Sequence, residues 1–308
     1  INDANDYKIV ICHQDSNNYT RVGSIEVTDV GGTLTPAAQG SSPVEYQLTT
    51  GPVQIAAMPE IQKFAIVYTA SYSTNLTTIN QIEVNSFGNF TVRTVSTIRS
   101  AFFQNTYRNN YTAWDGTALT VVYGNNSESA VKTRRCTPNG IGWSLGGETT
   151  VNSSYSSRNA IAYDSVNSRW FIFYNPTGTQ GYGRAGYLSG TAVITTLSSE
   201  YAFPDSGDLV GMKIKHDSTT GDMLCFYHLS GTGHKMQKAT ISDKVISFGT
   251  PASLNSNSSS SFSVADTGTE YFVTYFVSGG SSFGYNNYIP STIVTNADQF
   301  IGFAQDSA

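Results

Sequence analysis

A short strand-like phrase recurs six times along the 308 residues, and its spacing constrains the fold more than any other feature. Each copy is rich in apolar, β-branched or aromatic residues, and most copies end in Tyr. The copies read YKIVIC, KFAIVY, ALTVVY, RWFIFY, MLCFY and YFVTY, and their last residues are 12, 68, 123, 174, 227 and 275. Self-similarity at this interval of 48 to 56 residues is typical of a repeat architecture.

A four-stranded unit surrounds each copy of the phrase. An Asp or Pro precedes each copy of the phrase. Both residues favour tight turns, because Asp hydrogen-bonds its own backbone and Pro presets φ. These residues are Asp3, Pro59, Asp115, Asp164, Asp217 and Asp266. One short strand lies before the turn and two follow the phrase. Such units, each unable to close its own core, describe the blades of a β-propeller. A β-sandwich, the alternative, would not repeat one strand order six times.

We therefore predict an all-β, six-bladed β-propeller with four antiparallel strands per blade, as a single domain over residues 1–308. The expected blades span about 1–50, 51–105, 106–156, 157–207, 208–258 and 259–308. The first blade begins at its first turn, so we expect its innermost strand to be absent and the chain to be excised from a longer one. In the last blade we expect STIVT and QFIGFA as third and fourth strands.

Charge and hydropathy narrow the classes of partner. Charged residues make up 13% of the chain, and the net charge is −5. A protein that relies on phosphate contacts normally carries a basic patch. The only dense basic run is KTRR at 132–135, which alternates like a solvated outer strand, with a nucleic-acid site as the alternative. No apolar run approaches the roughly 18–20 residues of a membrane span. We expect no nucleic-acid partner and no membrane insertion.

Two phrases resemble a known group of proteins. KVISFGTPASLNS, with KATISD before it, and the ending TNADQFIGFAQDSA are similar to repeated and closing phrases of propeller proteins among virion and tail components of bacteriophages, especially marine ones. The resemblance implies a virion appendage, such as a tail fibre or receptor-binding part. It carries no catalytic residues to this chain.

The distribution of loop lengths indicates a binding face. In a propeller blade, the turns after the first and third strands lie on one face, and the loops after the second and fourth strands lie on the other. Here the second set is longer and rich in Tyr, Phe, Asn, Ser and Gly, a composition typical of paratopes that also suits sugar rings. Loops on a rigid scaffold often carry function. The predicted ligand-binding residues are Tyr72, Tyr107, Arg108, Tyr155, Tyr182, Tyr201, Tyr285, Asn286 and Tyr288. The alternative is that these residues only connect and cap the blades.

The pattern of carboxylates argues against an enzyme. A glycosidase needs two carboxylates about 5–9 Å apart. Among the segments expected to enter the central channel only Asp208 is acidic, and the repeated Asp residues belong to short turns on the other face, where we expect a structural role. We predict no catalytic residues.

Histidines and cysteines give no sign of a metal or cofactor. His216 and His228 are expected at opposite ends of one hairpin. His228 and His234 could meet across one loop, but two histidines are a weak metal site, and we interpret the histidines as surface residues. DSTTGD, beginning at 217, has the length of an ordinary hairpin turn rather than a calcium loop. Alternate blades do not touch, and a disulfide needs Cα atoms within about 7 Å. We therefore predict free thiols at Cys12, Cys136 and Cys225.

The resulting hypothesis is a non-enzymatic virion structural or receptor-binding module, an adhesin of a phage tail fibre or of a capsid or tail appendage. Its expected partners are other virion proteins and a host-surface polysaccharide or receptor, and its expected location is the virion surface. The alternatives are a secreted carbohydrate-binding or glycan-acting propeller of a cell, and a purely structural spacer.

Overall fold

The structure is a computed structural model of the chain. It describes residues 2–3, 6–14, 19–30, 33–48, 53–61, 63–70, 76–84, 90–99, 111–125, 129–156, 158–176, 180–189, 193–205, 207, 209–255, 262–266, 270–276, 284–290 and 301–303.

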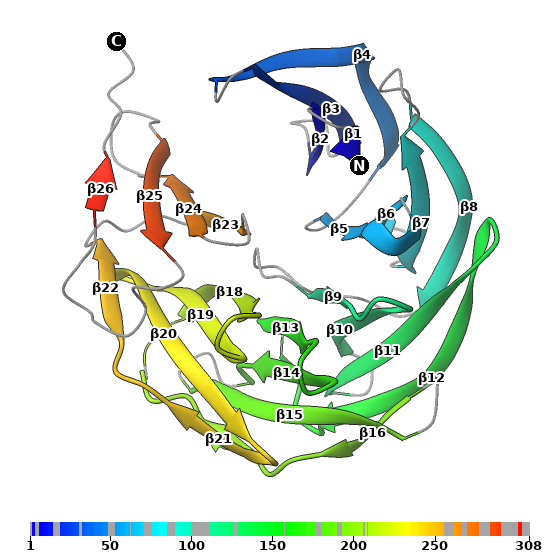
Figure 1. The fold of residues 1–308 in the computed structure, drawn as a ribbon. Helices are drawn as coiled ribbons and strands as arrows, with labels where there is room; N and C mark the ends of the chain where they lie inside the picture. The colour runs from blue at the N-terminus through cyan, green and yellow to red at the C-terminus, as the bar shows by residue number, and fades with distance from the viewer. Residues whose placement is uncertain are drawn as a thin grey trace.

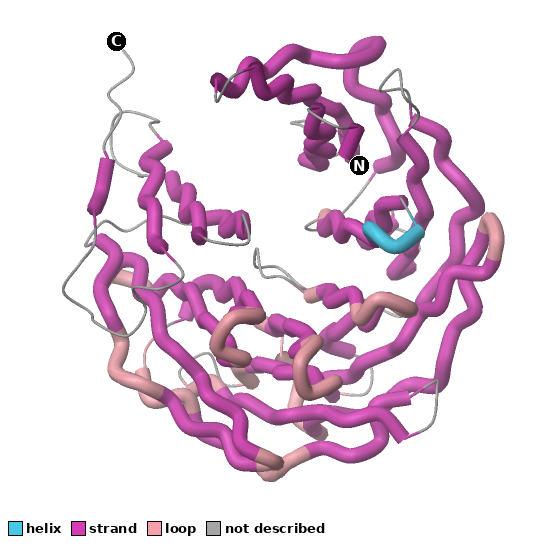
Figure 2. Tube along the Cα trace, in the orientation of Figure 1, coloured by secondary structure: helices cyan, strands magenta, loops and turns pink. Residues whose placement is uncertain are grey.

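These residues form antiparallel sheets arranged around a common centre, so the prediction of an all-β propeller is confirmed (Figures 1 and 2). Six sheets lie in the described part of the chain, and the first strand of each is nearest the centre (Figure 1). The first sheet contains β1 (Asn2–Asp3), β2 (Asp6–Gln14), β3 (Tyr19–Val30) and β4 (Thr33–Leu48). The second contains β5 (Gln54–Met58), β6 (Lys63–Ala70), β7 (Leu76–Val84) and β8 (Phe90–Arg99), with the 3-10 turn η1 (Pro59–Ile61) after β5.

The later sheets repeat the same antiparallel order. The third contains β9 (Thr112–Trp114), β10 (Leu119–Asn125), β11 (Ala130–Asn139) and β12 (Gly142–Asn152). The fourth contains β13 (Asn159–Asp164), β14 (Arg169–Tyr174), β15 (Tyr182–Ser189), β16 (Val193–Leu197) and β17 (Tyr201–Ala202). The fifth contains β18 (Leu209–Asp217), β19 (Asp222–Leu229), β20 (Gly233–Ser242), β21 (Val245–Phe248) and β22 (Ala252–Asn255). The sixth contains β23 (Phe262–Asp266), β24 (Glu270–Phe276), β25 (Gly284–Pro290) and β26 (Ile301–Phe303).

Three details differ from the expected strands. The fourth and fifth sheets have five strands, because their outer strand is divided: β16 and β17 both pair with β15, and β21 and β22 both pair with β20. The innermost strand of the first sheet is present, since β1 pairs with β2. In the sixth sheet the third strand is β25, and STIVT lies outside the described residues.

The described cores lie between neighbouring sheets. β14 carries RWFIFY, and all six residues are buried. Trp170, Ile172 and Tyr174 belong to a cluster shared with the second and third sheets. Phe171 and Phe173 belong to a cluster shared with the fifth. A strand packed on both faces has a continuous apolar sequence, which explains the phrase that defines the repeat.

Buried aspartates hold the short turns. Asp115 Oδ1 accepts backbone N–H groups of Thr117 (2.9 Å) and Ala118 (2.8 Å). Asp164 Oδ1 accepts those of Val166 and Asn167, both at 3.0 Å. The structural role predicted for these two residues is confirmed.

The DSTTGD segment is a hairpin turn of the same kind. Asp217 Oδ1 accepts the N–H of Thr219 (2.9 Å), and Thr220 Oγ1 donates to Asp217 Oδ2 (2.9 Å). The turn joins β18 to β19, whose first pair is Asp217 with Asp222. The interpretation of this segment as an ordinary hairpin is confirmed.

The basic run KTRR lies on β11, which is the third strand of its sheet, so its interpretation as a solvated outer strand is wrong. Arg135 is 8% exposed and pairs with Asp115 (2.6 Å). Lys132 lies 3.6 Å from a carboxylate oxygen of Glu148. Arg134 donates from Nε to Gly146 O (2.8 Å) and from Nη1 to Ile98 O. Carboxylates thus neutralise Lys132 and Arg135 within the fold, and backbone carbonyl oxygens bind Arg134.

His228 and His234 meet, as the sequence allowed, but inside the fold rather than at its surface. His228 and His234 face each other across β19 and β20, with stacked rings 4.7 Å apart, and they are 4% and 1% exposed. His216 Nε2 lies 3.0 Å from Asp164 Oδ1. Their interpretation as surface residues is wrong, because the register of the fifth sheet turns them toward neighbouring strands.

The described residues also show the state of two cysteines, the grouping of possible metal ligands and the length of helices. Cys136 and Cys225 are buried free thiols, as predicted, whereas Cys12 lies on β2 in a part whose side chains are not described. Among the described residues, no three His, Cys, Asp or Glu side chains gather in a group that could hold a metal ion. None of the described helices has the length and apolar character needed to span a membrane.

Candidate functional site

The predicted ligand-binding residues fall into three groups. Tyr72, Tyr107 and Arg108 lie outside the described residues, as does the channel candidate Asp208. Tyr285, Asn286 and Tyr288 lie on β25, paired with β24 and β26. Their placement in a loop was wrong, because pairing on both sides makes a strand of a Gly- and Asn-rich segment. Tyr155, Tyr182 and Tyr201 remain, with side chains that the structure describes.

Tyr155 caps the end of the third sheet. It lies between β12 and β13, half-buried, and its ring is so close to Gly124 that a Cβ atom at that glycine would meet it. Burial raises the pKa of the Tyr155 phenol to about 12. The residue therefore stays a neutral phenol packed on the sheet.

Tyr182 and Tyr201 lie on adjacent strands but on opposite faces of the fourth sheet. Tyr182 is opposite Ala202, and Tyr201 is opposite Gly183. The two tyrosines therefore occupy neighbouring pairs of the register, and side chains of neighbouring pairs point to opposite faces of a sheet. Accordingly, Tyr182 packs on the cluster shared with the third sheet, and Tyr201 on the cluster shared with the fifth. The structure does not bring these two predicted residues together into one contact surface.

A repeated set of hydrogen bonds was missed by the sequence analysis. The last tyrosine of the repeated phrase, on the second strand of its sheet, donates its hydroxyl to a carboxylate in three consecutive sheets. The pairs are Tyr123 with Glu148, Tyr174 with Glu200 and Tyr227 with Asp205. We call Glu148, Glu200 and Asp205 the rim carboxylates.

Glu200 and Asp205 are each anchored by one oxygen. Glu200 Oε1 accepts the Tyr174 hydroxyl (2.5 Å) and Asn152 Nδ2 (2.6 Å). Asp205 Oδ2 accepts the Tyr227 hydroxyl and Lys235 Nζ, both at 2.8 Å. In neither carboxylate does the second oxygen accept a hydrogen bond from the described residues. Glu200 is exposed, and the side chain of Asp205 is 18% exposed, so both present an oriented acceptor.

Protonation makes the two tyrosines permanent donors. Burial, and then the hydrogen bond and charge of Glu200, raise the pKa of the Tyr174 phenol far above its ordinary value. Burial and Asp205 do the same to the pKa of Tyr227. Each phenol therefore keeps its proton and fixes its carboxylate at any ordinary pH.

The signal for these pairs is only partly present in the sequence. The tyrosines end the repeated phrase, but the carboxylates follow or precede them by 25, 26 and 22 residues. Residues 198–208, SSEYAFPDSGD, connect the fourth expected blade to the fifth and contain both Glu200 and Asp205 beside Tyr201. Both carboxylates lie outside the segments expected to enter the central channel, so the pattern of channel carboxylates does not include them.

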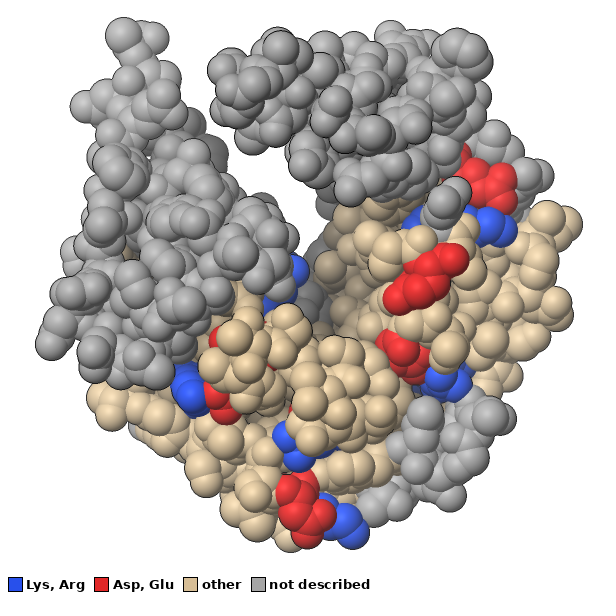
Figure 3. Space-filling model, viewed as in Figure 1, with Lys and Arg blue, Asp and Glu red and all other residues tan. Residues whose placement is uncertain are grey.

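The opposite face, which carries the short turns, shows acids and bases side by side rather than a patch of one sign among the described residues (Figure 3). Lys63 pairs with Glu83 (3.0 Å) on β7, and Lys238 pairs with Asp222. Trp114 Nε1 donates to Glu60 (2.5 Å). The two ion pairs neutralise charge locally, and the neutral indole of Trp114 holds Glu60 in place.

No protein-family model and no curated protein matches the chain by sequence. Comparison with solved structures, in contrast, finds proteins of similar fold. A Bacteroides fragilis protein provisionally described as a 6-phosphogluconolactonase has a TM-score of 0.63 at 7% identity, covering 97% of this chain and 81% of its own.

Lectins are also among the similar structures. The Aleuria aurantia lectin, in complex with Fucα1-6GlcNAc, has a TM-score of 0.56 at 11% identity and covers 91% of this chain and 87% of its own. A further structure of that lectin, described as a six-bladed β-propeller with a novel mode of fucose recognition, has a TM-score of 0.51 at 11% identity and covers 92% and 91%. At such identities the likeness establishes the propeller fold alone.

Proposed function

We propose that the chain is a non-enzymatic carbohydrate-binding module, a six-bladed propeller whose rim carboxylates accept hydrogen bonds from the hydroxyl groups of a glycan. The observation that carries the proposal is the anchoring of Glu200 and Asp205, each held by one oxygen while the other has no partner among the described residues. Lectins are among the proteins of similar fold, which is consistent with this use.

Anchoring matters because binding must overcome the cost of ordering flexible side chains, about 0.5–1.5 kcal/mol for each one. Tyr174 and Asn152 order Glu200 before any ligand arrives, and Tyr227 and Lys235 order Asp205. A sugar hydroxyl that donates to such an oxygen makes a charge-assisted hydrogen bond. Similar sets at neighbouring sheets can act together on a polysaccharide, so that weak contacts add to a useful avidity.

The surroundings of the rim carboxylates support binding without catalysis. A glycosidase uses two carboxyl groups on either side of one glycosidic bond. One oxygen of Glu200 and one of Asp205 are taken up by the hydroxyls of Tyr174 and Tyr227, an arrangement that holds each carboxylate as a fixed acceptor. The likeness to the 6-phosphogluconolactonase-like protein rests on 7% identity and carries no catalytic residue to this chain.

We also propose that the module is carried on a phage particle as an adhesin, next to other virion proteins. Support comes from the phrases KVISFGTPASLNS and TNADQFIGFAQDSA alone. The proteins of similar fold named above are not described as phage proteins. A secreted lectin of a cell is the alternative location for the same activity.

The test is a binding and hydrolysis assay with purified protein on a glycan array and on surface polysaccharide of candidate host cells. Glu200→Gln removes the charge of an exposed carboxylate that a tyrosine anchors. Glu60→Gln is the matched control, because Glu60 is also exposed and bonded to an aromatic donor, but lies on the opposite face.

We expect wild type and Glu60→Gln to bind glycan equally, without releasing sugar, and Glu200→Gln to bind at least about tenfold more weakly. Release of reducing sugar would overturn the non-enzymatic assignment. Failure of the wild type to bind any glycan or host surface would favour the structural spacer. Glycan binding by Glu200→Gln as tight as that of wild type would show that Glu200 does not contact the glycan.

A further inference from the structure

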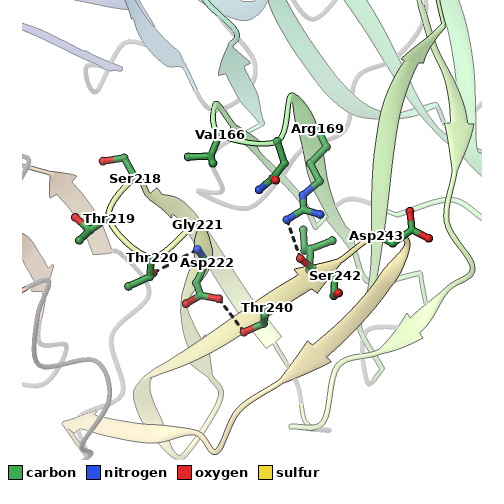
Figure 4. Close-up of a pocket in the computed structure, with 12 residues that line it drawn as sticks. Val166, Arg169, Ser218, Thr219, Thr220, Gly221, Asp222, Thr240, Ser242 and Asp243 are labelled. Atoms are coloured by element: carbon green, nitrogen blue, oxygen red, sulfur yellow. Dashed lines mark hydrogen bonds between the residues drawn. The ribbon is translucent and has the colours of Figure 1, made fainter.

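A polar pocket lies on the short-turn face, between the fourth and fifth sheets (Figure 4), and its lining contains none of the rim carboxylates. Its volume is about 340 Å³, near the lower end of the roughly 300–1,000 Å³ typical of ligand pockets. Three segments line it: the turn after β13, the turn after β18 and the end of β20. We call it the turn pocket.

Buried aspartates hold two walls of the turn pocket in place. Asp164, which is fully buried, accepts the backbone N–H groups that shape the turn after β13. Asp217, 3% exposed, holds the turn after β18 by accepting the backbone N–H of Thr219 and the hydroxyl of Thr220. The pocket is therefore preorganised by groups that lie behind its surface.

Arg169 supplies hydrogen-bond donors to the pocket. Its side chain is 6% exposed in a sheet interface and points toward the end of β20 (Figure 4). Nε donates to Asp164 Oδ2 (2.8 Å), and Nη2 donates to Ile241 O (2.7 Å). A guanidinium has five N–H groups. The remaining three N–H groups have no partner among the described residues. Because Arg169 lines the pocket, these groups can donate to a ligand there.

Hydroxyl groups make up most of the rest of the lining. They belong to Ser218, Thr219, Thr220, Thr240 and Ser242. Each can both donate and accept a hydrogen bond. Those of Ser218, Thr219 and Ser242 are exposed and bond to no other described side chain, so they are available to a ligand.

The charges in the turn pocket disfavour an anion. Arg169 is already balanced by Asp164, and Asp222 by Lys238. Asp243 adds a further carboxylate to the lining. A phosphate ester would meet the carboxylate of Asp243, while the cation of the lining, Arg169, is already compensated by Asp164. A ligand that is uncharged and rich in hydroxyl groups suits both the donors and the acceptors.

We propose that the turn pocket binds one uncharged monosaccharide unit, with Arg169 donating to a ring or hydroxyl oxygen and Ser242 closing one side. The site goes beyond the glycan contacts proposed at the rim, and the two sites can be present or absent independently.

The experiment is isothermal titration of the whole chain with glucose, galactose, mannose and fucose, and with glucose 6-phosphate and inorganic phosphate. Ser242→Trp fills the pocket from an exposed position at the end of β20. Thr137→Trp is the matched control, since Thr137 is also exposed, near the end of the third strand of its sheet, and outside the pocket lining. Circular dichroism checks that both variants fold.

We expect at least one uncharged sugar to bind wild type and Thr137→Trp alike, and to bind Ser242→Trp at least about tenfold more weakly. Failure of all four sugars to bind, tighter binding of the phosphates, or unchanged binding by Ser242→Trp would each overturn the proposal. Glu200→Gln separates the two sites. Sugar binding that is lost in Glu200→Gln and kept in Ser242→Trp would place the ligand at the rim and leave the proposed function standing.

Discussion

Single buried residues join neighbouring blades, and Asp164 is the clearest example. Its carboxylate accepts hydrogen bonds from Arg169 and Asn167 within the fourth sheet and lies 3.0 Å from His216 of the fifth. Burial opposes its ionisation, but the hydrogen bonds from Asn167 and Arg169 and the charge of His216 outweigh burial and lower the pKa of Asp164. The ionised form is therefore part of the folded structure.

A lowered pKa makes stability depend on acid in a defined direction. The contribution of Asp164 is complete above the unfolded value of about 3.9 and is lost as pH falls through the lower folded value. We expect Asp164→Asn to cost about 3 kcal/mol in the free energy of unfolding at pH 7, because Arg169 loses a buried partner. The difference from wild type should shrink in urea titrations at progressively lower pH, below about 4. Asp243→Asn, at an exposed residue, is the control, and a difference constant with pH would contradict the assignment.

Gly124 shows how one missing side chain shapes the end of a blade. A Cβ atom there would collide with the backbone oxygen of Ser156 and the ring of Tyr155. We expect Gly124→Ala to destabilise the fold by about 1–3 kcal/mol, as overpacking does. Gly142→Ala is the control, because the nearest atom to a Cβ there is 4.0 Å away. Thermal unfolding of both variants measures the effect, and equal midpoints would show that the backbone at Ser156 and the Tyr155 ring both move aside at little cost.

At the scale of elements, an arginine on the third strand connects the outer strands of adjacent sheets. Arg184 donates from Nε to Ser198 O (2.9 Å) in its own sheet and from Nη1 to Val151 O (2.5 Å) in the preceding one. Arg134 makes the same pair of bonds one sheet earlier. The repeat therefore extends beyond strand order to the contacts between blades.

Lysine cannot reproduce this bridge, because its single ammonium group lacks the fork geometry of guanidinium. We expect Arg184→Lys to lower the free energy of unfolding by about 1–3 kcal/mol, the cost of leaving a buried carbonyl without a donor. Lys244→Gln, at an exposed turn, serves as control. Denaturant unfolding measures the change. A variant as stable as wild type would show that water replaces the bridge.

At the scale of the whole molecule, the described cores lie between sheets rather than within one. Cys136 belongs to the cluster shared by the second, third and fourth sheets, and Cys225 to the cluster shared by the fourth and fifth. Burial raises the pKa of the Cys136 thiol to about 12 and that of Cys225 in the same direction. A reagent that needs the thiolate can reach these groups only when the blades separate.

Thiol labelling therefore reports opening of the ring. In a Cys12→Ser background at pH 8, we expect Cys136 and Cys225 to resist alkylation in the native state and to react together in urea, within the unfolding transition measured by circular dichroism. Mass spectrometry counts the labels. Rapid native labelling of one thiol would show that a single interface opens alone.

The sequence alone determined the architecture, because the features that define it are local. The repeated phrase marks a strand buried on both faces, and Asp115, Asp164 and Asp217 mark tight turns through bonds to their own neighbours. These properties depend on residues a few positions apart, so the interval between copies predicts successive sheets of one propeller.

Tertiary structure alone decided which side chains meet. Tyr174 reaches Glu200 across 26 residues, and His216 reaches Asp164 from the next sheet. Tyr182 and Tyr201, close in the sequence pattern, face opposite sides of one sheet because a shift of one pair reverses the direction of a side chain. The turn pocket likewise joins turns of two sheets. Such contacts depend on register and on packing between blades, which are properties of the assembled ring and not of any one segment.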